Sequence, residues 1–194
     1  ILDRVNPIGG QLVEGPCLET NYTSFVGRAA VPMRHGLTVG EMTCWINESM
    51  KINADLEVVS LQGWERSRQF DQCGLPWVAP SPNLPSWETC LVYPGQVVLE
   101  TTNISEGRGT DQPFLQCGAP YIDANILLEQ MSLLDLPGIS WSPATFEPTF
   151  DKWTGEVCQG LVLEVTNAVT FRPYRTTLAL IATVASLWPE DFQW

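Results

Sequence analysis

Positive charge is scarce in this sequence. The 194 residues hold 10 Lys and Arg against 22 Asp and Glu, which gives a formal net charge of −12, and charged residues make up only 16% of the chain. A protein that binds nucleic acid needs a basic stripe that displaces counterions from phosphates, so we expect no nucleic-acid partner. The acidity says little about a substrate, because net charge governs solubility and steering.

Several catalytic signatures are also missing. The sequence has neither the Gly-x-Ser-x-Gly turn of α/β-hydrolases nor the His-Glu-x-x-His motif of zinc peptidases. It contains a single histidine, His35, and no Cys-x-x-Cys pair, so a metal site is implausible and we expect no metal and no cofactor. A Ser-His-Asp triad that uses His35 stays open, although no local motif supports it.

Long apolar runs are absent, and so is an initiator methionine. The nearest approach to the roughly 18 apolar residues of a membrane span is the stretch 176–188, so we expect no membrane span. The chain begins with Ile1 and Leu2, which resemble the end of a buried strand, and we expect a mature or cleaved fragment. Hydrophobic residues still make up 44% of the chain, which is enough for a packed core.

The cysteines and glycosylation signals indicate a compartment. Six cysteines are an even number, which predicts up to three disulfides in any of fifteen pairings, with six reduced thiols as the alternative. Asn-x-Ser/Thr acceptors begin at Asn21, Asn47 and Asn103. Together these features favour the secretory pathway, so we expect a secreted or otherwise exported protein.

Hydrophobic periodicity and turn residues predict alternating helices and strands. Helices are expected over residues 39 to about 47, 123 to about 135, and 174–187, the first with Thr38 and Glu41 as a capping box. Strands are expected over residues 55–61, 96–100 and 159–166. Prolines between positions 76 and 94 mark a domain seam. The order of elements predicts an α/β fold followed by an α+β unit.

Two polar clusters lie in the first half of the chain. Glu14, in Val-Glu-Gly-Pro, follows a predicted strand, where open α/β sheets place their ligands. Arg34 and His35 directly precede a predicted helix, and a guanidinium at a helix start suits carboxylate or hydroxyl recognition. The structural alternatives are an exposed loop glutamate, an arginine paired with an acid, and a histidine satisfied by backbone.

A third polar cluster occupies residues 101–110. It contains Asn103, Ser105, Glu106 and Arg108, and its two glycines at 107 and 109 allow a close approach to a ligand. The spacing is not that of a phosphate loop, and an internal Glu106–Arg108 pair is the structural alternative. The side chains available for chemistry in these clusters are thus mainly carboxylates, arginines, amides and hydroxyls. Glycoside chemistry is the most natural enzymatic interpretation, because it needs little more than two carboxyl groups.

The sequence resembles the exo-β-N-acetylmuramidase family over essentially its whole length. The motifs that carry the resemblance are Asp3-Arg4-x-Asn6-Pro7-x-Gly9-Gly10, Val13-Glu14-Gly15-Pro16, Pro32-x-Arg34-His35-Gly36-x-Thr38-x-Gly40-Glu41, Gly63-Trp64-x-Arg66, Gly74-Leu75-Pro76-Trp77, Thr102-Asn103-Ile104-Ser105-Glu106-Gly107-Arg108-Gly109-Thr110 and Gly118-Ala119-Pro120-Tyr121-Ile122-Asp123. Jointly these motifs are highly specific.

The resemblance implies a fold and an activity. The fold is the latter part of a Rossmann-like catalytic domain over residues 1–90, followed by a smaller α+β auxiliary domain over residues 91–194. The activity is the release of terminal N-acetylmuramic acid from the non-reducing end of peptidoglycan fragments. Family members are about twice this long, so we expect a first portion, with one of two proposed catalytic glutamates, to be absent here. Glu14 resembles the second of them.

The resemblance also assigns binding roles. Arg34 or Arg108 would hold the lactyl carboxylate of the sugar through a two-pronged contact, while His35, Asn103, Ser105 and Glu106 complete the substrate-binding set. The cysteines depart from the family pattern, which we interpret as an exported version reinforced by disulfides. Because Asn103 lies in the cleft motif, we expect it to carry no glycan. Two alternatives remain: a muropeptide-binding or sugar-binding protein without turnover, and a subunit that pairs with a companion chain carrying the N-terminal part of the domain.

Overall fold

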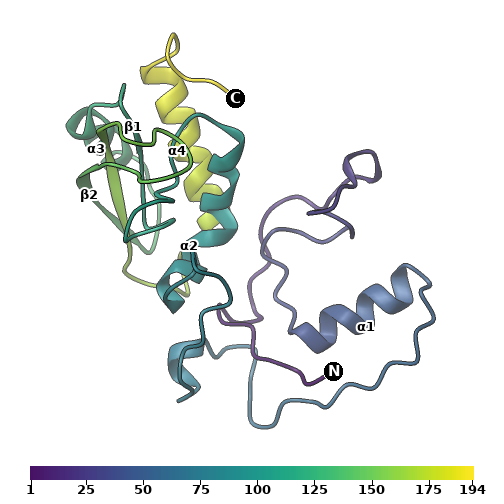
Figure 1. The fold of residues 1–194 in the computed structure, drawn as a ribbon. Helices are drawn as coiled ribbons and strands as arrows, with labels where there is room; N and C mark the ends of the chain where they lie inside the picture. The colour runs from purple at the N-terminus through teal and green to yellow at the C-terminus, as the bar shows by residue number, and fades with distance from the viewer. The chain divides into compact units, whose positions relative to one another are not determined.

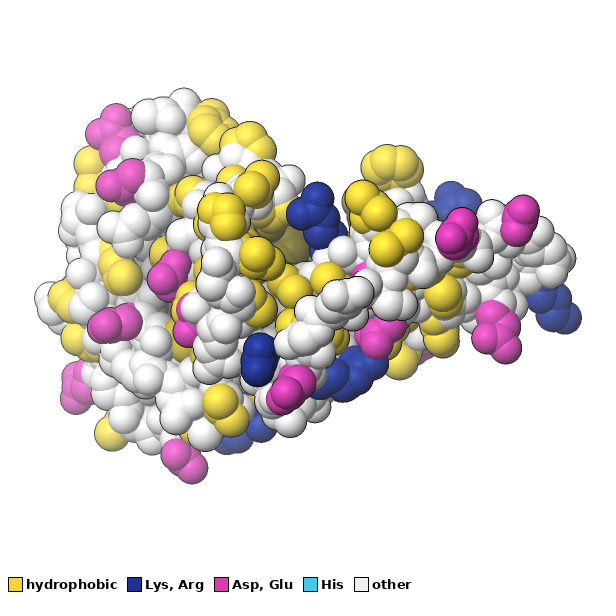
Figure 2. Space-filling view, turned by 90° about the horizontal axis from the view of Figure 1, so that it is seen from below, with side chains coloured by type: hydrophobic (Ala, Val, Ile, Leu, Met, Phe, Trp, Pro, Cys, Tyr) yellow, Lys and Arg dark blue, Asp and Glu magenta, His cyan; other side chains and the backbone are white.

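The computed structural model describes residues 1–194, which form two compact units, Ile1–Trp77 and Val78–Trp194 (Figure 1). None of its helices combines the length and apolarity that crossing a membrane requires. On the face drawn in Figure 2, acidic side chains are scattered, and Lys and Arg side chains stand in small separate groups.

The first unit is mostly irregular. Its one α-helix is α1 (Val39–Ser49), and two short 3-10 turns, η1 (Thr20–Tyr22) and η2 (Phe70–Gln72), accompany it. The predicted capping box is confirmed, because the Thr38 side chain accepts from the Glu41 N–H while the Glu41 carboxylate accepts from the Thr38 N–H. The first helix therefore starts where the local sequence dictates.

A carboxylate near the N-terminus fastens the start of α1. Asp3 accepts hydrogen bonds from the Gly40 N–H at 2.7 Å and the Thr38 hydroxyl at 2.9 Å. Burial of this carboxyl favours its neutral form, but hydrogen bonds from Gly40, Thr38 and Arg4 outweigh burial and lower the pKa of Asp3. The charged carboxylate also complements the positive end of the helix dipole.

The two strands expected in the first unit are not formed. Residues 1–2 and 55–61 contribute only one isolated parallel bridge, between Leu2 and Val59. Leu2 is 70% exposed and Val59 55% exposed, so the expectation of buried strands is wrong. The physical reason is that neither segment has a further strand beside it, and one bridge neither buries side chains nor sustains a ladder.

The second unit has a three-stranded antiparallel sheet and three α-helices. The elements are α2 (Trp87–Gln96), η3 (Val97–Thr101), β1 (Gln116–Ala119), α3 (Ala124–Ser132), β2 (Ile139–Phe146), β3 (Cys158–Val165) and α4 (Pro173–Leu187). The strand order is β1-β3-β2, with both pairs antiparallel. In Figure 1, α4 lies alongside α2, and a Cβ at Gly95 would lie only 2.1 Å from the Pro173 carbonyl oxygen. The chain thus contains a mixed helix and sheet fold with a small antiparallel sheet.

Local signals place most of the second unit. The predicted strand over 159–166 is β3, whose Leu161 and Leu163 point into the core at 0% and 2% exposure. The predicted helix that begins after Asp123 is α3. The Asp123 side chain caps it by accepting hydrogen bonds from the N–H groups of Asn125 and Ile126. The predicted closing helix is α4, with Pro173 in its first turn.

The strand expected over residues 96–100 is wrong. Residues 97–101 instead continue α2 as the 3-10 turn η3. Leu99 is fully buried among the core residues Val92, Phe114 and Leu180, which share its cluster. Burial of this one side chain overrides the strand preference of the two β-branched valines that precede it.

The cysteines form no disulfide. All six are free, which corrects the expectation of disulfide reinforcement. Cys90, Cys117 and Cys158 are buried, and burial raises the pKa of their thiols to about 11, 12 and 11. These three thiols stay protonated at neutral pH and act as small hydrophobic groups of the core.

Candidate active site

The first unit brings Glu14 and Arg34 together. The Glu14 N–H donates to the Arg34 carbonyl at 2.9 Å, and the Arg34 N–H donates to the Glu14 carbonyl at 3.0 Å. This antiparallel bridge closes the base of the loop over residues 15–33. Gly15, at φ +92°, turns the chain sharply after the carboxylate, in a conformation that favours glycine. Two residues that the sequence singled out, Glu14 and Arg34, are therefore held next to each other by backbone hydrogen bonds.

The guanidinium of Arg34 faces the interior of its unit. Arg34 is 3% exposed, and its Nη2 donates to the Ile8 carbonyl at 3.0 Å. The loop over residues 6–10 and the bridge to Glu14 are thereby tied to one side chain. A buried guanidinium held in this way fixes the backbone beside Glu14.

His35 is held as a neutral imidazole. Its Nδ1 accepts the Leu37 N–H at 3.0 Å, which assigns the proton to Nε2. Burial lowers the pKa of His35 below its ordinary value of 6.5. The ring therefore offers one N–H donor at neutral pH and suits a hydroxyl or amide oxygen.

Arg66 braces the His35 loop, and the sequence did not single it out as a site residue. Its Nη1 donates to the Gly36 carbonyl at 3.0 Å, and its Nη2 pairs with Glu41. The Gly10 N–H also donates to the Arg66 carbonyl at 2.8 Å. The Gly-Trp-x-Arg motif was the available signal, but its contacts span 25 to 30 residues of sequence.

In the second unit, Asn103 ties down the end of the chain. Its Nδ2 donates to the Asp191 carbonyl at 2.8 Å, and its Oδ1 accepts the Gln193 N–H at 3.0 Å and the Tyr121 hydroxyl at 2.9 Å. The Trp153 Nε1–H donates to the Asn103 carbonyl at 2.6 Å. The predicted substrate residue is thus fully engaged with protein partners in this structure.

Ser105 and Glu106 are buried, at 2% and 1% exposure. The Ser105 hydroxyl accepts the Gly107 N–H at 3.1 Å, and its backbone pairs with Gly118. Glu106 binds the Lys152 ammonium at 2.9 Å through Oε2 and the Arg108 Nε at 3.2 Å through Oε1. The carboxylate therefore has two cations beside it.

Arg108 completes a four-residue ion cluster with Glu106, Lys152 and Glu100. Its Nη2 lies 2.5 Å from a Glu100 oxygen, and its guanidinium carbon sits 4.9 Å from the centroid of the Phe114 ring. Burial favours the neutral arginine, but the hydrogen bond and charge of Glu100 and the charge of Glu106 outweigh it and raise the pKa of Arg108. The internal Glu106–Arg108 pair foreseen as the structural alternative is present.

The glycines of this loop approach protein backbone. Gly107 and Gly109 have φ of +79° and +80°, and a Cβ on them would lie 2.7 Å from the Gln116 carbonyl oxygen and 2.6 Å from the Phe150 carbonyl oxygen. The Thr149 N–H donates to the Gly109 carbonyl at 2.9 Å. The close approach expected toward a ligand is therefore made, in this structure, by the chain itself.

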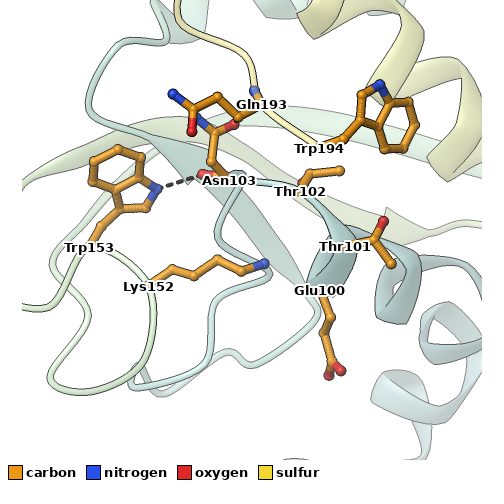
Figure 3. A pocket seen from close by; sticks show the side chains of 8 residues that line it. All are labelled: Glu100, Thr101, Thr102, Asn103, Lys152, Trp153, Gln193 and Trp194. Atoms are coloured by element: carbon orange, nitrogen blue, oxygen red, sulfur yellow. Dashed lines mark hydrogen bonds between the residues drawn. The ribbon is translucent and has the colours of Figure 1, made fainter.

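A hollow opens beside the Asn103 loop (Figure 3). Its volume is about 500 Å³, and the residues that line it are Glu100, Thr101, Thr102, Asn103, Lys152, Trp153, Gln193 and Trp194. Sequence reasoning gave no site role to Lys152, Trp153 or Trp194, because they come to this hollow from segments that lie far from Asn103 in sequence. Trp194 belongs to the motif Pro189-x-x-Phe192-x-Trp194, which also occurs in the family that the sequence resembles, but the motif assigns no role to it.

Both units match one family. Residues 91–194 match the family model described as the C-terminal region of exo-β-N-acetylmuramidase NamZ, and residues 1–88 match the one described as its N-terminal region. The peptidoglycan β-N-acetylmuramidase NamZ of Bacillus subtilis (strain 168) is 47% identical over 193 residues, which cover 100% of this chain and 47% of that protein. The whole chain aligns within that one polypeptide, so a companion chain is not supported.

Two solved structures from Bacteroides fragilis NCTC 9343 resemble the chain. One DUF1343 family protein, at 30% identity and a TM-score of 0.91, covers 97% of this chain and 50% of its own. A second, at 25% identity and a TM-score of 0.70, covers 98% of this chain and 51% of its own. The chain thus spans about half the length of the relatives it matches.

Proposed function

The chain belongs to the NamZ exo-β-N-acetylmuramidase family, and from this premise we propose that it serves a glycoside hydrolase that releases terminal N-acetylmuramic acid from the non-reducing end of peptidoglycan fragments. The B. subtilis relative, which matches this whole chain, bears the name of that activity. The observation that carries the proposal is the position of Glu14, fixed by its bridge to Arg34 within the matched region.

The domain organisation belongs to the same proposal. Residues 1–90 form the latter part of a Rossmann-like catalytic domain, and residues 91–194 form the auxiliary α+β domain. The parallel pairing of Leu2 with Val59 supports the first assignment, because Rossmann-like sheets are built from parallel strands. Because peptidoglycan lies outside the cell membrane, the protein is secreted or otherwise exported. The cysteines do not support export, because none of them forms a disulfide.

Glu14 supplies one of the two carboxyl groups of glycoside hydrolysis. The bond between the anomeric carbon and the leaving oxygen breaks through an oxocarbenium-like state. One carboxylic acid gives its proton to the leaving oxygen, while a carboxylate takes a proton from water or attacks the anomeric carbon. The separation of the two carboxyls decides whether configuration is inverted or retained.

The contacts of the other predicted site residues suggest the role of each. His35, with its neutral Nε2–H, donates to a hydroxyl or acetamido oxygen of the sugar. Arg34, which is buried and bridges to Glu14 through the backbone, fixes the chain that carries that carboxylate. Arg108 is the second unit's candidate for the lactyl carboxylate, which would exchange with the half-exposed Glu100 that pairs with Arg108 in this structure. Asn103, Ser105 and Glu106 act through Arg108, since they hold the loop that carries it.

The test of the catalytic assignment is Glu14→Gln in the protein expressed from its complete reading frame. We expect hydrolysis of a chromogenic N-acetylmuramide to fall by at least about 100-fold, the lower end of what acid–base catalysis contributes. Glu19→Gln, an exposed carboxylate on the same loop, is the matched control and should retain full activity. Undiminished hydrolysis by Glu14→Gln contradicts the assignment. Binding of the muramide without release by the unmutated protein would favour the sugar-binding alternative.

A further inference from the structure

The hollow beside Asn103 carries two indole rings from distant parts of the chain. Trp153 comes from the segment before β3 and Trp194 from the segment after α4, and Figure 3 shows them on either side of Thr102 and Asn103. Trp194 is 77% exposed. Trp153 is partly buried against the core, so Trp194 is the ring that this hollow leaves open to solvent. A largely exposed tryptophan is costly in water, and at a polar hollow it indicates a ligand with an apolar face.

Trp153 is held in place at the hollow by contacts within the chain. The Trp153 Nε1–H is held by the Asn103 carbonyl, and the ring packs edge-on against Tyr121 with centroids 6.3 Å apart. Burial and the charge of Asp191 raise the pKa of Tyr121 to about 12, so its hydroxyl stays a neutral donor to Asn103 at ordinary pH. A ligand that enters therefore meets a preformed surface, which limits the ordering cost of binding.

The charges at the hollow are already matched within the chain. The Lys152 ammonium donates to the Leu99 carbonyl, the Ile104 carbonyl and Glu106, at 2.7, 3.0 and 2.9 Å. An ammonium has three donors, so none remains for a ligand. The Glu100 carboxylate is paired with Arg108. An anionic ligand would have to displace Glu100 from Arg108 to reach a cation, so the hollow itself favours a neutral ligand.

Polar groups are still available at the rim. The Gln193 side-chain amide lines the hollow and makes no hydrogen bond within the chain, while the Gln193 backbone is fastened to Asn103 on both sides. An amide that is both donor and acceptor suits hydroxyl groups. A pyranose ring has an apolar C–H face that can stack on an indole ring, and hydroxyl groups that can bond to an amide. A hollow with both kinds of group and no available charge therefore suits a neutral sugar.

We propose that this hollow binds a neutral pyranose ring of the N-acetylhexosamine class, stacked on Trp194 and hydrogen-bonded to Gln193. The site is distinct in chemistry from the one proposed for muramic acid, whose lactyl carboxylate requires a cation. It goes beyond the proposed function, because it requires no hydrolysis. Its role is to hold an uncharged sugar unit of a glycan.

The probe is chitotriose, a neutral N-acetylglucosamine trimer, titrated calorimetrically into the protein. We expect binding that Trp194→Ala weakens about tenfold, the upper range for loss of one aromatic contact. Phe150→Ala, an exposed aromatic of the same unit outside this hollow, is the control and should bind as the unmutated protein does. Circular dichroism confirms that each variant is folded.

Salt dependence provides a second readout. Binding of a neutral sugar should be unchanged between low and high ionic strength, whereas binding of an anion weakens as salt screens it. No binding of chitotriose at millimolar concentration, equal binding by Trp194→Ala, or a steep salt dependence overturns the proposal. Hydrolysis of the N-acetylmuramide is measured separately, so failure here leaves the proposed function intact, and loss of hydrolysis leaves this site intact.

Discussion

The carboxylate of Glu106, 1% exposed, lies 2.9 Å from the ammonium of Lys152 and is one of three acceptors that surround that cation. The pair joins the loop after η3 to the segment before β3. In this structure the pair is an internal contact, so a polar motif of this loop can contribute to the fold without facing a ligand.

Removal of Lys152 should destabilise the second unit strongly. Lys152→Met leaves the Glu106 carboxylate buried beside one cation only, and breaking a buried pair costs about 3–5 kcal/mol of unfolding free energy. The chain's other lysine, Lys51, is exposed. Lys51→Met should therefore change the free energy of unfolding by less than about 0.5 kcal/mol. Urea denaturation measures both. Because the cost comes from the orphaned charge, Lys152→Met with Glu106→Gln should be more stable than Lys152→Met alone.

Asn103→Ala should release the end of the chain. The substitution removes the side-chain bonds to Gln193, Tyr121 and Asp191, at a cost of about 1–3 kcal/mol. Hydrogen exchange of the segment after α4 should accelerate. Gln193→Ala keeps the backbone bonds and should exchange at the original rate. A glycan found on Asn103 by peptide mapping would contradict this packing.

Gly109→Ala should lower the free energy of unfolding more than Gly155→Ala does. Both glycines have positive φ, +80° and +76°, so each substitution costs about 1–2 kcal/mol of backbone strain. Only Gly109 also has a backbone atom, the Phe150 carbonyl oxygen, at 2.6 Å from the added Cβ, while nothing lies within 4 Å at Gly155. The difference in unfolding free energy isolates the clash, about 1–3 kcal/mol. Equal losses would mean that the loop adapts.

The stability of the first unit should depend on pH through His35. The folded pKa lies below 6.5, so the unfolded chain binds a proton that the folded chain resists. Its contribution is constant above about pH 6.5 and is lost as pH falls below that value toward the folded pKa. His35→Asn retains an acceptor for the Leu37 N–H and should flatten this part of the profile, as followed by thermal unfolding between pH 5 and 8. An unchanged slope in His35→Asn would exclude His35 as its source.

Elements with local signals were predictable from the sequence. Thr38 with Glu41, Asp123 and Pro173 each specify a helix start through residues within one turn, and the structure has helices at all three. Residues 97–101 show the opposite case, because the β-branched valines favour a strand and only the burial of Leu99 in a distant core makes them helical.

The candidate site was predictable only in part. Glu14 and Arg34 stood out by residue type and are joined in the structure, yet their pairing across a long loop has no local signal. Lys152 could not be singled out, because its acceptors lie 46 to 53 residues away in sequence, and Trp194 could be noticed only as part of the closing motif Pro189-x-x-Phe192-x-Trp194, with no role assigned. The partners of Asn103 near the chain end could not be predicted either, because they are brought together only by folding.

The most direct measurement of the central claim compares two disaccharides that differ only in order. The protein, expressed from its complete reading frame, is incubated with one that carries N-acetylmuramic acid at the non-reducing end and one that carries N-acetylglucosamine there. Mass spectrometry follows the free sugars. We predict release of N-acetylmuramic acid from the first and no cleavage of the second. Equal cleavage of both, or cleavage of neither, would contradict the account.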